Sequence, residues 1–323
     1  MIVKAEILWT RMCPLRCHYC NMVTGEQNTP DIYYWMRGLD TLKSLNCKFI
    51  AIYGAEPLSD FAKLPAFVHY ANHLGIDMTV ITSGCAVDTL EKLTELYTAG
   101  LRSLTTSYDI VDLDLSSKAK SSKALELLEF FRSLGPVDNV AVVVTLTKKN
   151  YKLLYNVMEE MTARNIWTFF DIIHPDRGQP GSKVRGSDPE LLFSEEDLPD
   201  VVVELRKIRE AKGKLMIHAS PLFFDFLIKH PKTLLKYDWN CAKYKCFPSW
   251  VTVDCDGMVY PCDDFQVKNT GVPLIDLHRR WDEVSDTWRK SVKKDCPGCC
   301  WNTHLDAHYI KQNLVNISEY VHK

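Results

Sequence analysis

The chain has 323 residues, a formal net charge of −2, and a composition that is 46% hydrophobic and 25% charged. This length and composition allow about two domains, or one barrel-sized domain with an addition, and a sizeable core. They argue against a general polyanion binder, so nucleic acid is not indicated as a partner. Because no membrane-length apolar stretch and no signal peptide are present, we expect a cytoplasmic protein without a membrane partner.

Short apolar runs alternate with helix-period segments through the first half of the chain. Strands are predicted at 2–10, 49–53, 78–82, 101–107, 140–147 and 167–173, and helices at 32–45, 61–74, 88–99, 118–134 and 151–164. Asp88 is expected to cap its helix, while Gly75 and Gly100 end two others. Strands joined through helices imply parallel pairing in an α/β fold. A doubly wound sheet fits the alternation, but no G-x-G-x-x-G follows the first strand to support dinucleotide binding.

Polar and glycine-containing segments follow the predicted strands, where parallel α/β folds place their chemistry. After the first strand come three cysteines, and after the later strands come the segments GAEP (54–57), TSG (82–84), SYD (107–109) and DIIHPDRG (171–178). In the last segment, Asp171 and His174 are candidates for contact with a substrate, although a simple loop role is the alternative.

The twelve cysteines are clustered, which in a reducing compartment indicates metal or redox sites. Cys13, Cys17 and Cys20 form the pattern C-x3-C-x2-C. Three thiolates on one loop can bind three irons of an iron–sulfur cube and leave the fourth for a small molecule. Structural zinc would need four ligands, and His18 is awkwardly placed between two of the cysteines to be one. Zinc or unliganded cysteines are the alternatives.

These cysteines, with Tyr19 before the last of them and GAEP after the second strand, resemble the radical S-adenosylmethionine (SAM) superfamily over about residues 1–180. The resemblance implies a partial (βα)6 TIM-like barrel. It also implies a [4Fe-4S] cluster whose open iron binds SAM. Reductive cleavage of SAM would yield a 5′-deoxyadenosyl radical that abstracts hydrogen from a substrate, with an external reductant such as flavodoxin or ferredoxin.

Further residues match the family's SAM contacts. The segment from Gly54 resembles the backbone platform for the SAM amino group, with Glu56 as its polar anchor and Ala55 where the family has glycine. Ser83 and Ser107, at successive strand ends, resemble the ribose and carboxylate contacts. An ordinary turn and helix approach are the alternative interpretations of these residues.

A second cysteine group lies near the C-terminus. Two short strands around Asp256-Gly257 predict a hairpin that brings Cys246 and Cys262 together, and a C-P-x-C knuckle follows with Cys296 and Cys299. The four resemble the ligands of one auxiliary [4Fe-4S] cluster in a twitch or SPASM extension. A zinc knuckle is the alternative, and three other cysteines are surplus candidates, namely Cys241, Cys255 and Cys300.

Three parts are therefore expected: a radical SAM core at 1–180, a linker with helices completing the barrel at 181–238, and an auxiliary Fe–S domain at 239–323. Helices are predicted at 195–212 and 222–229. We expect an oxidoreductase or tailoring enzyme. Its substrate is a small molecule, sugar, nucleotide or peptide, and the early first strand tilts the choice away from a peptide. The alternatives are a molybdenum-cofactor-cyclase-like nucleotide rearrangement and a non-catalytic metal-binding or electron-transfer protein.

Overall fold

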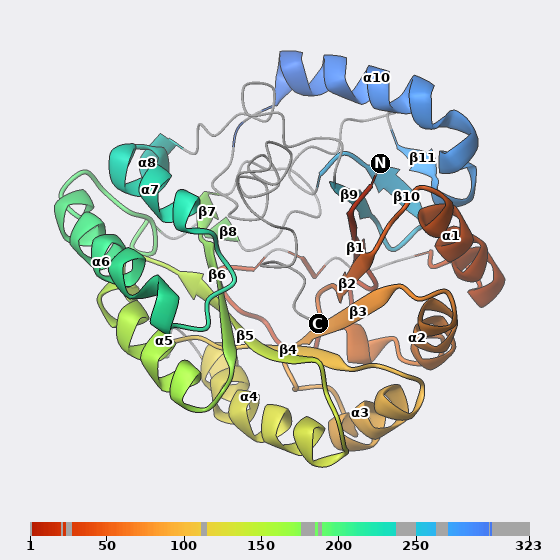
Figure 1. Ribbon diagram of the computed structural model, residues 1–323, viewed down its shortest axis with the longest axis horizontal. Helices are drawn as coiled ribbons and strands as arrows, with labels where there is room; N and C mark the ends of the chain where they lie inside the picture. The colour runs from red at the N-terminus through yellow and green to blue at the C-terminus, as the bar shows by residue number, and fades with distance from the viewer. Residues whose placement is uncertain are drawn as a thin grey trace.

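A computed structural model describes residues 2–20, 22–23, 28–110, 115–175, 185–186, 189–236, 250–262, 271–296 and 298. Its main feature is a curved, mostly parallel sheet with helices around the outside (Figure 1). The first six strands pair in parallel in chain order: β1 Lys4–Leu8, β2 Phe49–Tyr53, β3 Asp77–Thr82, β4 Ser103–Ser107, β5 Asn139–Leu146 and β6 Trp167–Ile172. The α/β fold and the partial TIM-like barrel expected from the sequence are confirmed.

The helices between these strands also match the predicted pattern, with ends moved by a few residues. They are α1 Ile32–Ser44, α2 Leu64–His73, α3 Thr89–Thr98, α4 Leu115–Ser133 and α5 Leu154–Ala163, with short 3-10 turns at η1 Pro57–Ser59 and η2 Tyr151–Leu153. After the barrel strands come α6 Leu198–Ala211, η3 Lys212–Lys214, α7 Pro221–Lys229 and α8 Thr233–Lys236. A small parallel pair, β7 His174–Pro175 and β8 Arg185–Gly186, follows β6.

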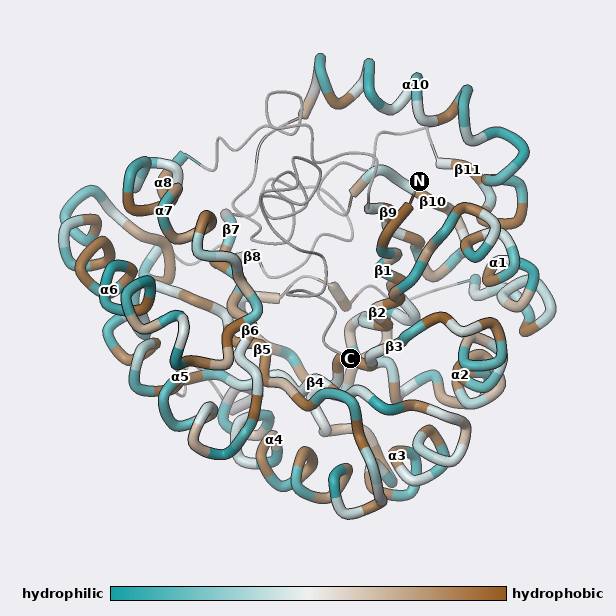
Figure 2. The backbone as a smooth tube through the Cα atoms, in the orientation of Figure 1, coloured by the Kyte–Doolittle hydropathy of each residue, from teal (hydrophilic) through white to brown (hydrophobic). Residues whose placement is uncertain are grey.

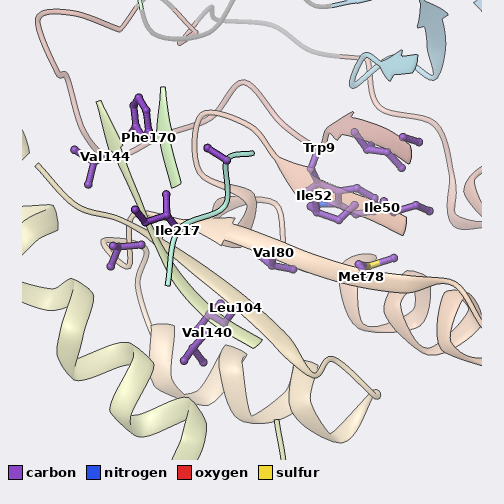
Figure 3. Packing of buried hydrophobic residues seen from close by; sticks show 14 of the residues in the cluster. Trp9, Ile50, Ile52, Met78, Val80, Leu104, Val140, Val144, Phe170 and Ile217 are labelled. Carbon is purple, nitrogen blue, oxygen red and sulfur yellow. The ribbon is translucent and has the colours of Figure 1, made fainter. Parts of the chain in front are cut away.

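The main core lies between the sheet and the surrounding helices. Because side chains of a strand alternate between its faces, every second residue points toward the helices. Figure 3 shows part of this core, and its labelled residues are all buried: Trp9, Ile50, Ile52, Met78, Val80, Leu104, Val140, Val144, Phe170 and Ile217. Along the outer helices hydrophobic and hydrophilic residues alternate, as amphipathic packing on a sheet requires (Figure 2). None of the helices in the described part of the chain combines the length and apolarity needed to cross a membrane.

Residues typical of helix ends stand at the ends of α1 and α2, and one predicted cap, at the start of α3, is wrong. Asp31 caps α1, because its side chain accepts a hydrogen bond from the Tyr34 amide at 2.8 Å. Gly75 follows α2 with φ 64°, as expected for a glycine that ends a helix. The predicted side-chain cap at Asp88 is wrong. Its backbone is left-handed (φ 52°, ψ 40°), whereas a capping residue is extended, and its carboxylate caps no amide of α3.

The predicted hairpin is present as β9 Trp250–Val253 and β10 Met258–Tyr260, which pair antiparallel. Gly257 has φ 79° in the turn, and a β-carbon there would lie 2.4 Å from the Tyr34 ring of α1. Tyr34 donates a hydrogen bond to the Gly257 carbonyl at 2.8 Å and accepts one from the Leu274 amide at 3.0 Å. The hairpin turn is thereby fixed against the first helix of the barrel.

The hairpin also continues the barrel sheet. β9 pairs in parallel with β1, and β11 Val272–Pro273 pairs with β10, so the order is β11-β10-β9-β1-β2-β3-β4-β5-β6. After η4 Leu274–Asp276 comes α10 Leu277–Asp295, which the sequence analysis did not predict and which packs beside α1 (Figure 1). The described strands of the predicted part 239–323, β9 to β11, are therefore joined to the barrel sheet through β1.

Candidate functional site

The loop that leaves β1 carries the first three cysteines, and it is fixed to the segment that leaves β2. The Ala55 amide donates to the Thr10 carbonyl at 3.0 Å, and the Glu56 amide donates to the Met12 carbonyl at 2.9 Å. A β-carbon on Gly54 would lie 2.7 Å from the Thr10 carbonyl oxygen. Glycine at position 54 therefore allows the two backbone segments to approach closely.

The cysteine loop, residues 13–20, holds three half-buried thiols, those of Cys13, Cys17 and Cys20. The Cys20 amide donates to the Cys17 carbonyl at 3.0 Å, which closes a turn between those two residues. Burial, together with the charges of Glu56, Cys20 and Cys17, raises the pKa of Cys13 to about 12. Burial also raises the pKa of Cys20. The three thiols are therefore close enough to interact electrostatically.

Across the described ranges, no three His, Cys, Asp or Glu side chains are gathered as a ready metal-binding group. The cysteine loop therefore provides three thiols of the right chemistry without holding them converged. Soft thiolate ligands suit iron–sulfur clusters, so the donor set fits such a group.

Glu56 anchors the segment after β2 to the end of β3. It is fully buried, and one carboxylate oxygen accepts hydrogen bonds from the Thr82 hydroxyl at 2.7 Å and the Leu58 amide at 3.1 Å. The other oxygen accepts from the Ser83 amide at 2.8 Å and from the Ser83 hydroxyl. The structure thus brings together the predicted site residues Glu56 and Ser83. All of the hydrogen-bond donors to the Glu56 carboxylate named here are uncharged amides and hydroxyls.

On the β4 side, the loop contacts a buried polar cluster. The Tyr19 hydroxyl donates to Asp109 Oδ2 at 2.5 Å, and the Lys120 Nζ lies 2.6 Å from the same oxygen. Lys120 also donates to the Tyr19 hydroxyl. The side chains are almost completely enclosed, with exposed fractions of 2% for Tyr19, 4% for Asp109 and 7% for Lys120. We call these three residues the Tyr19–Asp109–Lys120 cluster.

The remaining predicted residues of the barrel lie at strand ends. Ser107 is the half-buried last residue of β4. Asp171 is half-buried in β6, and His174 is buried in β7 with its Nδ1 atom 2.8 Å from the Ile172 carbonyl oxygen. All three are therefore at the carboxyl edge of the parallel sheet, where chemistry is expected.

The structure describes part of the second cysteine group. Cys262 follows β10, Cys296 follows α10, and both are half-buried. Cys255 is buried beside Asp254, whose carboxylate accepts hydrogen bonds from Nη2 of Arg11 at 2.9 Å to each oxygen. Burial raises the pKa of Cys255 to about 12, as expected for a packed thiol. Four other candidates lie outside the described residues, namely Cys241, Cys246, Cys299 and Cys300.

The fold and the loop together define a partial parallel α/β barrel with a three-cysteine loop after its first strand. The family model described as "Radical SAM superfamily" matches residues 7–161. This part of the chain is a radical SAM domain. No match was found among curated proteins.

Solved structures share the fold at low sequence identity. The crystal structure of Streptococcus suis SuiB bound to S-adenosylmethionine is 16% identical, with a TM-score of 0.65, and the match covers 99% of this chain and 76% of that one. Native anSMEcpe with bound AdoMet and Cp18Cys peptide is 14% identical, with a TM-score of 0.60, and the match covers 99% of this chain and 100% of that one. These likenesses show the fold.

The sequence analysis missed the pairing of Asp109 with Lys120. Asp109 was noted only as part of SYD, and Tyr19 only as the aromatic residue before Cys20. Lys120 lies in a stretch of small and basic residues, LSSKAKSSK, which has no motif to mark it. The pairing depends on how α4 packs against β4.

Proposed function

We propose that this protein is a radical SAM enzyme whose Cys13, Cys17 and Cys20 bind a [4Fe-4S] cluster with one iron left for SAM. One observation carries the proposal. Three half-buried thiols in the spacing C-x3-C-x2-C lie on one loop at the end of β1, within the segment that matches the radical SAM family. When bound, the cluster would supply the electron that cleaves SAM, and the resulting 5′-deoxyadenosyl radical would take hydrogen from the substrate.

Cluster binding requires the loop to gather its thiols. The three side chains are not converged in this structure, so they must turn toward one point as they bind iron. Each must also lose its proton, because thiolates are the ligands. Burial raises the pKa of Cys13 and Cys20, so the metal has to displace those protons.

The segment after β2 is suited to hold the amino end of SAM. Gly54 lets this backbone lie against Thr10, just before the cysteine loop, and Glu56 fixes it through neutral donors at the end of β3. We propose that Gly54, Glu56, Ser83 and Ser107 line the SAM site. In this arrangement Ser83 holds Glu56 in position, since its hydroxyl and its amide both donate hydrogen bonds to that carboxylate.

We further propose an auxiliary [4Fe-4S] cluster on Cys246, Cys262, Cys296 and Cys299. Support comes from the spacing of these cysteines and from the half-buried thiols of Cys262 and Cys296. Because β9 pairs with β1, the segment that leads to Cys262 is tied to the strand that leads to the SAM cluster. Such a cluster would accept an electron from the substrate or anchor it, and zinc is the alternative occupant.

The proposed reaction is an oxidation or a tailoring step on a small molecule, sugar, nucleotide or peptide. Peptides belong in the test set because structures with this fold include SuiB bound to precursor peptide SuiA and anSMEcpe with a Cp18Cys peptide. Asp171 and His174 are the proposed residues on the substrate side. A flavodoxin or ferredoxin is the proposed reductant, and the cytoplasm the proposed compartment.

The test is anaerobic reconstitution with iron and sulfide, followed by SAM and dithionite. We expect roughly eight irons per chain, as two four-iron clusters require, and formation of 5′-deoxyadenosine. Cys17→Ala should remove about half of the iron and abolish SAM cleavage. Cys47→Ala, which removes a buried thiol of the main core, is the matched control and should keep both.

Different outcomes separate the parts of the proposal. A loaded wild-type protein that never forms 5′-deoxyadenosine, with or without candidate substrates, would indicate a non-catalytic electron-transfer protein. Zinc retained in a Cys17→Ala protein and lost in Cys262→Ala would contradict the auxiliary cluster alone. Normal SAM cleavage by Cys17→Ala would refute the assignment of the three ligands.

A further inference from the structure

A buried cation lies next to the proposed cluster-binding loop. The Lys120 ammonium is held by Asp109 and by the Tyr19 hydroxyl, with an exposed fraction of only 7% for the whole residue. Tyr19, which lies between Cys17 and Cys20 in the loop, packs in an apolar cluster with Ile173 and Leu191. The lysine is thus attached to the loop at the position between two proposed iron ligands.

The cation also interacts with those ligands. Burial acts to lower the pKa of Lys120, yet its pKa is raised, because Asp109 and then Cys17 and Cys20 favour its charged form. The Lys120 ammonium contacts the Tyr19 hydroxyl, and Tyr19 belongs to the apolar cluster against which the Cys17 and Cys20 side chains pack. Inside a protein such interactions are screened much less than in water. One side chain, that of Tyr19, therefore connects the ammonium to the two cysteines that would hold the cluster.

A purely structural role explains this arrangement poorly. Apolar side chains fill an interior at lower cost than a buried lysine and aspartate, which must both give up water. Tyr19 alone could pack the loop against Ile173 and Leu191. What the lysine adds is a fixed positive charge beside two ligands, offset by a carboxylate. Cluster potentials respond to nearby charge and to hydrogen bonding around the ligands.

We propose that Lys120 is a positioning residue that raises the reduction potential of the SAM-binding cluster, while Asp109 limits that effect. The inference rests on the proposed function, since it requires a cluster on Cys13, Cys17 and Cys20. The step concerned is the transfer of one electron from an external reductant to the oxidised cluster. The reduced cluster carries one more negative charge, which the ammonium stabilises. Tyr19 links the charge pair to the loop and keeps it at one distance from the ligands.

The test is a redox titration of the reconstituted protein, followed by the electron paramagnetic resonance signal of the reduced cluster. It is done in a Cys262→Ala background, so that the auxiliary site does not contribute. Lys120→Met should lower the ratio of reduced to oxidised cluster about tenfold at a fixed potential, a shift of about −59 mV for one electron. Asp109→Asn should shift the potential in the opposite direction. The double variant Asp109→Asn/Lys120→Met removes both charges and should lie between the two single variants.

Lys123→Met is the matched control, because Lys123 is exposed on the same helix and interacts with Cys85 instead of the proposed ligands. Lys123→Met should change the ratio of reduced to oxidised cluster at a fixed potential by less than threefold. Iron content and circular dichroism show whether each variant is loaded and folded. If Lys120→Met does not hold a cluster, the direction of the Lys120 effect is measured by comparing Asp109→Asn with the double variant. The double variant must then have the lower reduction potential of the two.

Shifts of the same sign in both single variants, or loaded variants with unchanged potentials, would overturn the inference and leave the proposed function standing. A wild-type protein that takes up no cluster would overturn both. A Lys120→Arg variant with the wild-type reduction potential would support the positive charge as the cause. A Lys120→Arg variant with the same potential as Lys120→Met would contradict it.

Discussion

The cysteine loop lies between two buried carboxylates that are stabilised in different ways. On the β2–β3 side, the described structure gives Glu56 only neutral partners, which are two amides and two hydroxyls. On the β4 side, Asp109 is paired with Lys120 and accepts a hydrogen bond from Tyr19. Both carboxylates are nearly inaccessible to solvent, so the difference lies in charge and not in exposure.

This difference makes the two sides of the loop electrostatically unequal. The Glu56 side keeps a net negative charge, and that charge acts on Cys13 by raising its pKa. The Asp109 side is a compensated pair whose cation acts on Cys20 in the opposite direction. Under the proposed function, the negative carboxylate would attract the amino group of SAM, and the cation beside the proposed ligands would favour a cluster that gains an electron.

The largest effect is expected from Glu56→Ala. The substitution leaves a cavity and removes the acceptor of four buried donors, so the free energy of unfolding should fall by about 4 kcal/mol. Urea unfolding of the protein before reconstitution measures this loss. Glu56→Gln, which keeps the shape but turns a donor toward Ser83, should lose less. A Glu56→Ala loss below about 1 kcal/mol would show that the donors find other partners.

The charge pair on the other side should behave differently. Removing one partner leaves a buried charge unpaired, so Lys120→Met and Asp109→Asn should each lower the free energy of unfolding by about 3 kcal/mol. The double variant should lose less than the sum of the single variants, because neither charge is then left alone. Additive losses in this double-mutant cycle would contradict a direct pairing.

The barrel and the cysteine loop could be predicted from the sequence because their signals are local. β2 Phe49–Tyr53 was predicted to the residue, since five apolar residues between Lys48 and Gly54 define a buried strand. The cysteine spacing and the GAEP segment are also short-range patterns. Even α10 had a signal that was overlooked, because its buried residues Val284, Trp288 and Val292 are four residues apart.

The rest depends on long-range packing. Tyr19, Asp109 and Lys120 are brought together by the pairing of strands and by the position of α4, which no short pattern encodes. The same is true of β9, whose hairpin was predictable while its parallel pairing with β1 was not. The Asp88 cap failed because its backbone is left-handed, and residue type alone does not determine that angle.

A smaller effect on the Glu56 side is expected from Gly54→Ala. The new β-carbon would lie 2.7 Å from the Thr10 carbonyl oxygen, a backbone atom that can move only if the chain leading to the cysteine loop moves too. The free energy of unfolding should therefore fall by about 2 kcal/mol. Gly213→Ala is the matched control, because nothing lies within 4 Å of a β-carbon there. Thermal unfolding should separate the two variants, and equal stabilities would show that the two backbone segments are not in close contact.

The smallest effect is expected on the other side, from Tyr19→Phe. The variant keeps the ring in its apolar packing but removes the hydroxyl that donates to Asp109 and accepts from Lys120. The ion pair remains, so the loss of unfolding free energy should be about 1 kcal/mol, the typical contribution of a hydrogen bond. Urea unfolding of Tyr19→Phe alone and with Lys120→Met measures it. If the charge pair is the main support on this side, the hydroxyl should matter less once Lys120 is gone. A loss as large as that of Lys120→Met would instead make Tyr19 the principal partner of Asp109.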